Sequence, residues 1–178
     1  IEPPTANQAL LDFDESEYFS LRVTPAGMLS FGSSHGGLQA FLTERAGKPL
    51  ADGEWHYVAF TFRCLDCMDG GGGGADGTKR IFRDGVLTAN STSLAAIGSR
   101  AALRRYGVIG DGSEVSSIDA AAAADERRIS GDFFDGDISL LHMHPVALSA
   151  IQVLIFCADC VHNLEGAGPM LDWTRICF

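Results

Sequence analysis

The chain has 178 residues and a net charge of −10, from 13 Lys and Arg against 23 Asp and Glu. This length fits one domain, and the acidic balance argues against a general affinity for nucleic acid or for an anionic membrane, because both need clustered basic side chains. The most apolar run, 146–157, is shorter than the roughly 18 uncharged apolar residues that a membrane span requires.

Residues 1–9 are polar and contain two adjacent prolines, which predicts a linker or an arm. The chain opens at Ile1 and not at a methionine, so we expect a processed or partial product from which a targeting segment could have been lost. Strand material is predicted to begin at residues 10–13.

Glu15 and Glu17 follow, and their spacing would place two carboxylates on one face of a strand. Carboxylates about 5 Å apart are the geometry of a retaining glycoside hydrolase. The surrounding acidic residues are more typical of a hairpin tip, so we favour a turn over a catalytic pair. Residues 17–31 then predict a hairpin that turns at a glycine, and 29–42 predict two more strands around the small residues 32–37.

The stretch from Trp55 to Phe62 has no polar face, which is typical of a strand covered on both sides. Asp52-Gly53 before it has the chemistry of a tight turn. We therefore expect this strand to run through the middle of a sheet, with the indole of Trp55 sealed in the core.

Two Cys-x-x-Cys pairs stand far apart in the chain, at Cys64 and Cys67 and at Cys157 and Cys160. Four thiolates could bind zinc, but the gap of about 90 residues far exceeds the usual ~15–20. Disulfides are the alternative in a secreted chain, and we prefer a cross-link between the two pairs, although the sequence does not choose among the three pairings. Cys177 would be left free or paired with another chain.

The glycine run 70–74 predicts a hairpin tip and not a phosphate-binding loop, because no Lys-Ser/Thr pair with a following helix comes after it. Asp84-Gly85 predicts the next hairpin turn. Asn90-Ser91-Thr92 is an N-glycosylation acceptor, which we expect in a loop of an extracellular protein.

Basic residues gather at two places. Each group could contact a sulfated glycan, or it could simply be part of a solvated surface beside many carboxylates, and the second case is the more common. These candidate ligand contacts are Arg104, Arg105, Arg127 and Arg128. The alanine run within 116–129 predicts one short helical insertion between strands.

Residues 138–144 alternate in the manner of a strand, which would place His142 and His144 on one face. Such a pair could bind zinc or copper, but a third ligand is not apparent nearby, and half-exposed strand histidines are the commoner arrangement.

Several of these pieces, in this order, resemble the laminin G-like domains of the concanavalin A-like lectin superfamily: 17–31, the Trp-His strand at 52–62, the Asp-Gly hairpin at 80–86, the strand 106–110 that ends in glycine, 134–138, and the Ala-Leu-Ser turn at 145–149. The resemblance implies an all-β, jelly-roll sandwich of two antiparallel sheets over residues 10–160. The tail, 161–178, would pack on the sandwich or on a neighbour.

The family's calcium site is in doubt, because His35 stands where an aspartate is expected and imidazole suits calcium poorly. Asp111 and Glu114 remain as candidates for weak calcium binding. The function implied is non-enzymatic extracellular recognition or adhesion, with a glycan or a protein as the partner. The alternatives are a structural bead of a larger extracellular filament or matrix protein, and a glycoside hydrolase that uses Glu15 and Glu17.

Overall fold

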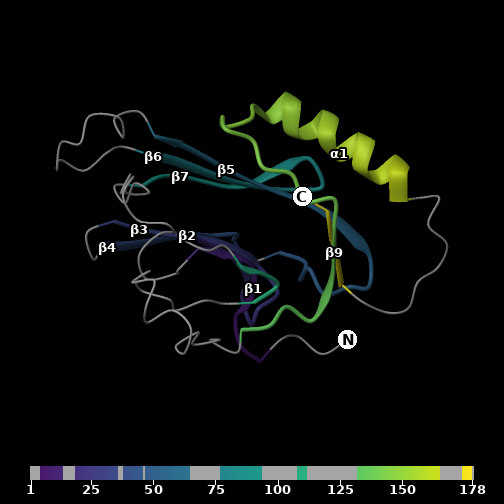
Figure 1. Cartoon of the computed structure of the whole chain (residues 1–178), viewed down its shortest axis with the longest axis horizontal. Coiled ribbons are helices and arrows are strands. Elements are labelled where there is room, and N and C mark those ends of the chain that lie inside the picture. The colour runs from purple at the N-terminus through teal and green to yellow at the C-terminus, as the bar shows by residue number, and fades with distance from the viewer. Residues whose placement is uncertain are drawn as a thin grey trace, which may run out of the picture.

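The computed structural model describes residues 5–13, 19–35, 38–45, 47–64, 77–93, 108–111, 132–164 and 174–177. These residues form two β-sheets that face one another, with one helix outside the second sheet (Figure 1). The predicted all-β sandwich is therefore confirmed.

The first sheet has five strands in the order β4-β3-β2-β1-β8, and every pairing in it is antiparallel. Its strands are β1 Gln8–Phe13, β2 Phe19–Val23, β3 Leu29–His35, β4 Leu38–Thr43 and β8 Val108–Ile109. Leu11, Leu21, Phe31 and Leu42 lie opposite one another on successive strands and form one apolar row that faces the second sheet. The hairpins predicted from the alternating sequence at 17–42 are thus present.

The second sheet also has five strands, in the order β7-β6-β5-β10-β9. Its strands are β5 Trp55–Cys64, β6 Gly77–Arg83, β7 Val86–Ser93, β9 Gly136–Ser139 and β10 Thr174–Cys177. Strands β5, β6 and β7 are antiparallel, whereas β10 pairs in parallel with both β5 and β9. The end of the chain is therefore a strand of the sheet itself, although the sequence alone suggested only a packed tail.

Two of the described turns show most clearly why glycine is needed. Asp84 and Gly85, between β6 and β7, both have positive φ, 52° and 77°, as the predicted two-residue hairpin turn demands. Gly27, between β2 and β3, has φ 74°, and a Cβ built on it would lie 2.7 Å from Cβ of Pro49. A side chain at position 27 is therefore excluded both by the backbone conformation and by the loop before β5.

The core between the sheets centres on Phe31, which is 3% exposed. Its ring meets those of Phe19, Phe60 and Phe62 edge to face, at centroid separations of 6.4, 5.9 and 6.4 Å. The fully buried Val58 and Ile81 complete the second sheet's contribution. Aromatic and branched side chains from both sheets thus share one apolar interior.

Trp55 does not occupy the centre of this core. It is the first residue of β5 and only partly buried, because it lies at the end of the strand, opposite Arg175 of β10. The expectation of a sealed indole was wrong. The middle of the same strand, at Val58, takes the central position instead.

Lys79 crosses between the sheets. It is fully buried in β6, its Nζ donates a hydrogen bond to the carbonyl of Ala40 in β4 at 2.7 Å, and it lies 5.3 Å from the centroid of the Phe31 ring. Burial lowers the pKa of Lys79 to about 8. This bond ties the second sheet to an edge strand of the first.

Helix α1, Ala150–Leu164, covers the outer face of the second sheet (Figure 1). Val153 and Cys157 pack one turn apart against Tyr57 and Phe82. The helix begins at Ser149, whose Oγ accepts from the N–H of Gln152 at 3.4 Å while the Gln152 Oε1 accepts from the N–H of Ser149 at 2.9 Å. This reciprocal capping box was visible in the sequence and was not used to predict a helix.

The predicted strand over 138–144 ends early, at Ser139, because Leu140 takes a left-handed conformation with φ 53°. The predicted helical insertion at 116–129 lies outside the described residues. In the described part of the chain, no helix is both long and apolar enough to cross a membrane.

Candidate functional site

The loop before β5 is held to the sandwich by two polar clusters. In the first, Glu44 accepts the N–H of Leu29 at 2.9 Å and pairs with Arg83, whose Nη1 donates to the carbonyl of Lys48 at 2.6 Å. The side chains of Glu44 and Arg83 are 3% and 13% exposed. This buried ion pair therefore joins β3, β6 and the loop at one point.

The second cluster is centred on His56, whose side chain is 12% exposed. Its Nδ1 lies 2.9 Å from Oδ2 of Asp84, and its Nε2 lies 3.0 Å from Oδ1 of Asp52. Asp84 also accepts the N–H of Tyr57 at 3.0 Å, and Asp52 pairs with Lys48 at 2.6 Å. Both ring nitrogens of His56 are engaged, so the cluster joins the loop to the β6–β7 turn.

The charges in this cluster support one another. The hydrogen bond to Asp84 raises the pKa of His56, burial opposes this, and Asp52 raises it further, with a net increase above 6.5. Burial disfavours the Asp52 carboxylate, but hydrogen bonds from Lys48, the Glu54 N–H and His56 outweigh that effect and lower the pKa of Asp52 to about 2.

We expect this cluster to make the free energy of unfolding depend on pH. Because its pKa is raised by folding, His56 contributes stability that is fully present below about pH 6.5 and lost as the pH rises through the folded pKa. The contribution of Asp52 is present above pH 3.8 and is lost only as the pH falls towards about 2. Urea unfolding of wild type and His56→Gln should therefore differ most near pH ~5.5 and least near pH ~8.5.

The difference between the two proteins is the quantity to follow, because Lys79 is common to both and itself titrates near pH 8. Its lowered pKa adds stability to each protein as the pH rises above 8. A wild-type advantage that stayed constant or grew from pH ~5.5 to ~8.5 would contradict the role assigned to His56.

A groove of about 430 Å³ runs along one side of the sandwich, at the seam where edge strand β4 of the first sheet meets edge strand β7 of the second. We call it the seam groove; it is lined by Leu42, Thr43, Arg45, Leu87, Thr88, Ala89, Asn90 and Ser91. Arg45 and Asn90 are exposed, and Leu87 is 46% exposed. Hydroxyls, an amide and a guanidinium therefore stand beside apolar side chains on one open surface.

Asn90 lies within β7 and not in the predicted loop. It is exposed and pairs with Arg80 of β6. The predicted loop is absent at this position because β7 continues past the acceptor triplet to Ser93. Its exposed edge position still leaves room for a carbohydrate chain, so glycosylation of Asn90 stays a prediction.

The cysteines are described only in part. Cys157 is a buried free thiol beneath Gly85, with a raised pKa caused first by burial and then by the charge of Asp84. The predicted cross-link is therefore not formed at Cys157, because α1 directs this side chain into an apolar contact with the sheet. Side chains of Cys64, Cys67, Cys160 and Cys177 lie outside the described residues.

Of the predicted calcium ligands, catalytic glutamates and arginine contacts, the structure describes only Asp111. Asp111 is partly buried just after β8, and Glu114 lies outside the described residues. The same holds for both glutamates of the hydrolase alternative and for the four arginines proposed as ligand contacts, namely Glu15, Glu17, Arg104, Arg105, Arg127 and Arg128. Within the described ranges, no three His, Cys, Asp or Glu side chains are grouped to hold a metal ion.

His142 and His144 are exposed and belong to an irregular segment that follows β9. The ring of His144 lies against that of Phe156 in α1, with centroids 5.1 Å apart. The strand that would have aligned the two histidines is absent at these positions, so the spacing argument for a zinc or copper site does not apply.

Comparison with known proteins gives one family. A family model described as the concanavalin A-like lectin/glucanases superfamily matches residues 1–154. A search of the curated proteins found no match.

Among solved structures, the chain is similar to the crystal structure of an S-layer domain-containing protein from Clostridium thermocellum, at 18% identity and a TM-score of 0.40. The match covers 86% of this chain and 64% of that chain.

Proposed function

The chain belongs to the concanavalin A-like lectin/glucanases superfamily, and from that membership and the chemistry of the seam groove we propose that it is a non-enzymatic extracellular module that recognises a glycan. The observation that carries the proposal is the groove itself, which is open to solvent, has a volume of about 430 Å³ and is lined by polar groups from two sheets.

The groove suits a sugar because a sugar ring offers hydroxyls on its edges and apolar patches on its faces. The Thr88 hydroxyl donates to the carbonyl of Ile81 at 3.2 Å and the Thr43 hydroxyl is hydrogen-bonded to Ser30 Oγ at 2.9 Å, so both remain as acceptors for a ligand, and Arg45 supplies several donors. Leu42 and Leu87 supply apolar contact. The open shape also fits an extended oligosaccharide better than a compact metabolite, which needs an enclosing pocket.

Backbone groups add to this chemistry. Among the described strands, β4 and β7 are the outermost of their sheets on this side, so alternate N–H and C=O groups of each have no ladder partner there. An array of fixed donors and acceptors is thus available along both walls.

The strength of glycan binding should depend on whether Asn90 is itself glycosylated. A glycan attached to Asn90 would begin inside the groove and compete with a soluble ligand. We therefore expect protein made without N-glycosylation to bind more strongly than the glycosylated form.

A glycan array, read with and without calcium, tests the proposal on unglycosylated protein. We expect a defined set of oligosaccharides to bind without being hydrolysed. Arg45→Ala should weaken binding by about tenfold or more, since a hydrogen bond from a charged group is worth roughly 1.5–3 kcal/mol. Arg63→Ala, at an exposed arginine of β5 outside the groove, should leave binding unchanged. Absence of binding, or release of shorter glycans, would contradict the proposal.

One observation favours a second candidate, a structural module in a larger assembly. The outer side of α1 and the segment before it expose apolar side chains, with Ile151 72%, Leu154 54%, Ile155 55% and Val146 67% exposed. Apolar surface of this kind commonly marks a protein contact. This candidate would be favoured if no glycan on the array bound and if sedimentation velocity showed concentration-dependent association. Ile155→Lys should abolish that association.

A further inference from the structure

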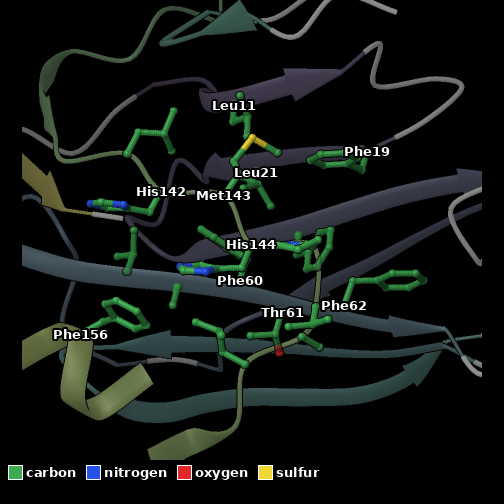
Figure 2. Close-up of a pocket in the computed structure, with 18 of the residues that line it drawn as sticks. Leu11, Phe19, Leu21, Phe60, Thr61, Phe62, His142, Met143, His144 and Phe156 are labelled. Carbon is green, nitrogen blue, oxygen red and sulfur yellow. The ribbon is translucent and has the colours of Figure 1, made fainter. Parts of the chain in front are cut away.

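A second cavity lies beside β5, between the two sheets and reaching Phe156 of α1, and it has a different chemistry from the seam groove. It has a volume of about 240 Å³ and is bounded by β1, β2 and β3 on one side and by β5 on the other. Figure 2 shows Leu11, Phe19 and Leu21 from the first sheet near Phe60 and Phe62 from the second. Residues 141–148, which we call the crossing segment, form its remaining wall.

The crossing segment is largely exposed to solvent. Met143, which lines the cavity, is 65% exposed, and Val146 is 67% exposed. The left-handed conformation of Leu140 directs the chain out of β9 just before this segment, and a residue with a Cβ adopts that conformation only at an energetic disadvantage. The cavity is therefore reachable from solvent beside the crossing segment.

Strand β5 leaves part of one edge unoccupied next to this cavity. On its other edge β5 pairs with β6 from Val58 to Cys64, whereas β10 pairs with it only from Trp55 to Tyr57. Among the described residues, the edge beyond Tyr57 has no partner strand, so backbone polar groups are available there beside an apolar interior.

We propose that this cavity binds a small apolar molecule with one polar end, such as an aromatic or medium-chain alcohol. Apolar side chains, phenylalanine and leucine above all, make most of the lining, so an occupant gains by leaving water for an apolar surface. A sugar is disfavoured here because its buried hydroxyls would lack partners. The polar end meets the open edge of β5, the Thr61 hydroxyl or the imidazoles of the crossing segment.

The volume sets the size of the molecule. A dry cavity of about 150 Å³ accommodates benzene, so a cavity of about 240 Å³ accommodates a molecule of roughly the size of indole or 1-octanol.

The test uses protein labelled with ¹³C at the methionine methyl groups and titrated with indole and with 1-octanol. Met143 lines the cavity, whereas Met28 is buried elsewhere, at the β2–β3 turn. We expect the Met143 methyl resonance to shift saturably with a dissociation constant below the millimolar range, while the Met28 resonance stays in place. Absence of a saturable shift in the wild-type protein would overturn the proposal.

Two tryptophan variants locate the binding. Ala147 is exposed on the crossing segment and lines the cavity, so Ala147→Trp adds bulk at its mouth and should weaken binding at least tenfold. Val86, 64% exposed in β7 and absent from the lining, offers the matched control, and Val86→Trp should bind as wild type does. Equal affinity in all three proteins, or equal loss in both variants, would show that the probes bind elsewhere, for example on the exposed side of α1, and would overturn the assignment.

Discussion

Arg83→Met is expected to destabilise the domain by about 3–5 kcal/mol, the typical loss when one partner of a buried ion pair is removed. Glu44, 3% exposed at its side chain, would keep its hydrogen bond from the Leu29 N–H but lose its only described cationic partner. The carbonyl of Lys48 would lose a donor as well. Urea denaturation followed by circular dichroism measures the change.

Two further variants show whether the charge is the cause. Adding Glu44→Gln to Arg83→Met should recover part of the lost stability, because a neutral amide is less unfavourable than an unpaired carboxylate in this position. Lys48→Met, at a side chain that is 74% exposed, should change stability far less than Arg83→Met does. A loss of similar size in Lys48→Met and Arg83→Met would contradict the importance given to burial.

Phe31→Ala is expected to reduce the free energy of unfolding by about 3–5 kcal/mol, the range for a buried phenylalanine cut to alanine. The substitution removes the ring that meets Phe19, Phe60 and Phe62, and it also removes the surface beneath the ammonium of Lys79. Equilibrium denaturation gives the value, and an unchanged m-value would show that the same cooperative unit unfolds.

Phe41→Ala is the matched control, because Phe41 lies on the next strand and is 50% exposed. Its ring rests against the guanidinium of Arg22, with the centroid 5.7 Å from Cζ, a contact worth about 1 kcal/mol. Comparable losses from both alanine variants would contradict the placement of Phe31 at the centre of the core.

Local patterns predicted most of the strands. The hairpins at 17–42 and the turn at Asp84-Gly85 depend on alternating side chains and on glycine chemistry within a few residues, and these signals are complete in the sequence. The apolar stretch after Trp55 likewise identified β5. Burial within that strand was placed wrongly, because the position of a residue relative to the end of the sandwich is set by partners far away in the chain.

Long-range pairings account for what the sequence did not predict. Strand β10 joins β5 across more than a hundred residues and has only four positions, too few for a recognisable pattern. The Glu44–Arg83 pair and the bond between His56 and Asp84 join residues that are far apart in the chain, and nothing local indicates either one. Helix α1 is different, since the Ser149 and Gln152 capping box was a usable local signal.

The seam groove also depends on tertiary structure, because its two walls come from β4 and β7, which are edge strands of different sheets. No motif in either strand indicates that Arg45 and Thr88 share one surface. The sequence predicted a recognition module through its family resemblance, and the position of the groove follows only from how the two sheets align.

The most direct test of glycan recognition at the seam groove is a two-dimensional amide NMR titration with the oligosaccharide that binds best on the array. The account predicts that the amide resonances of Thr43, Arg45, Thr88 and Ser91 shift together with one dissociation constant, and that those of the crossing segment and α1 remain unchanged. Shifts confined to the crossing segment or to α1, with the seam groove silent, would contradict it.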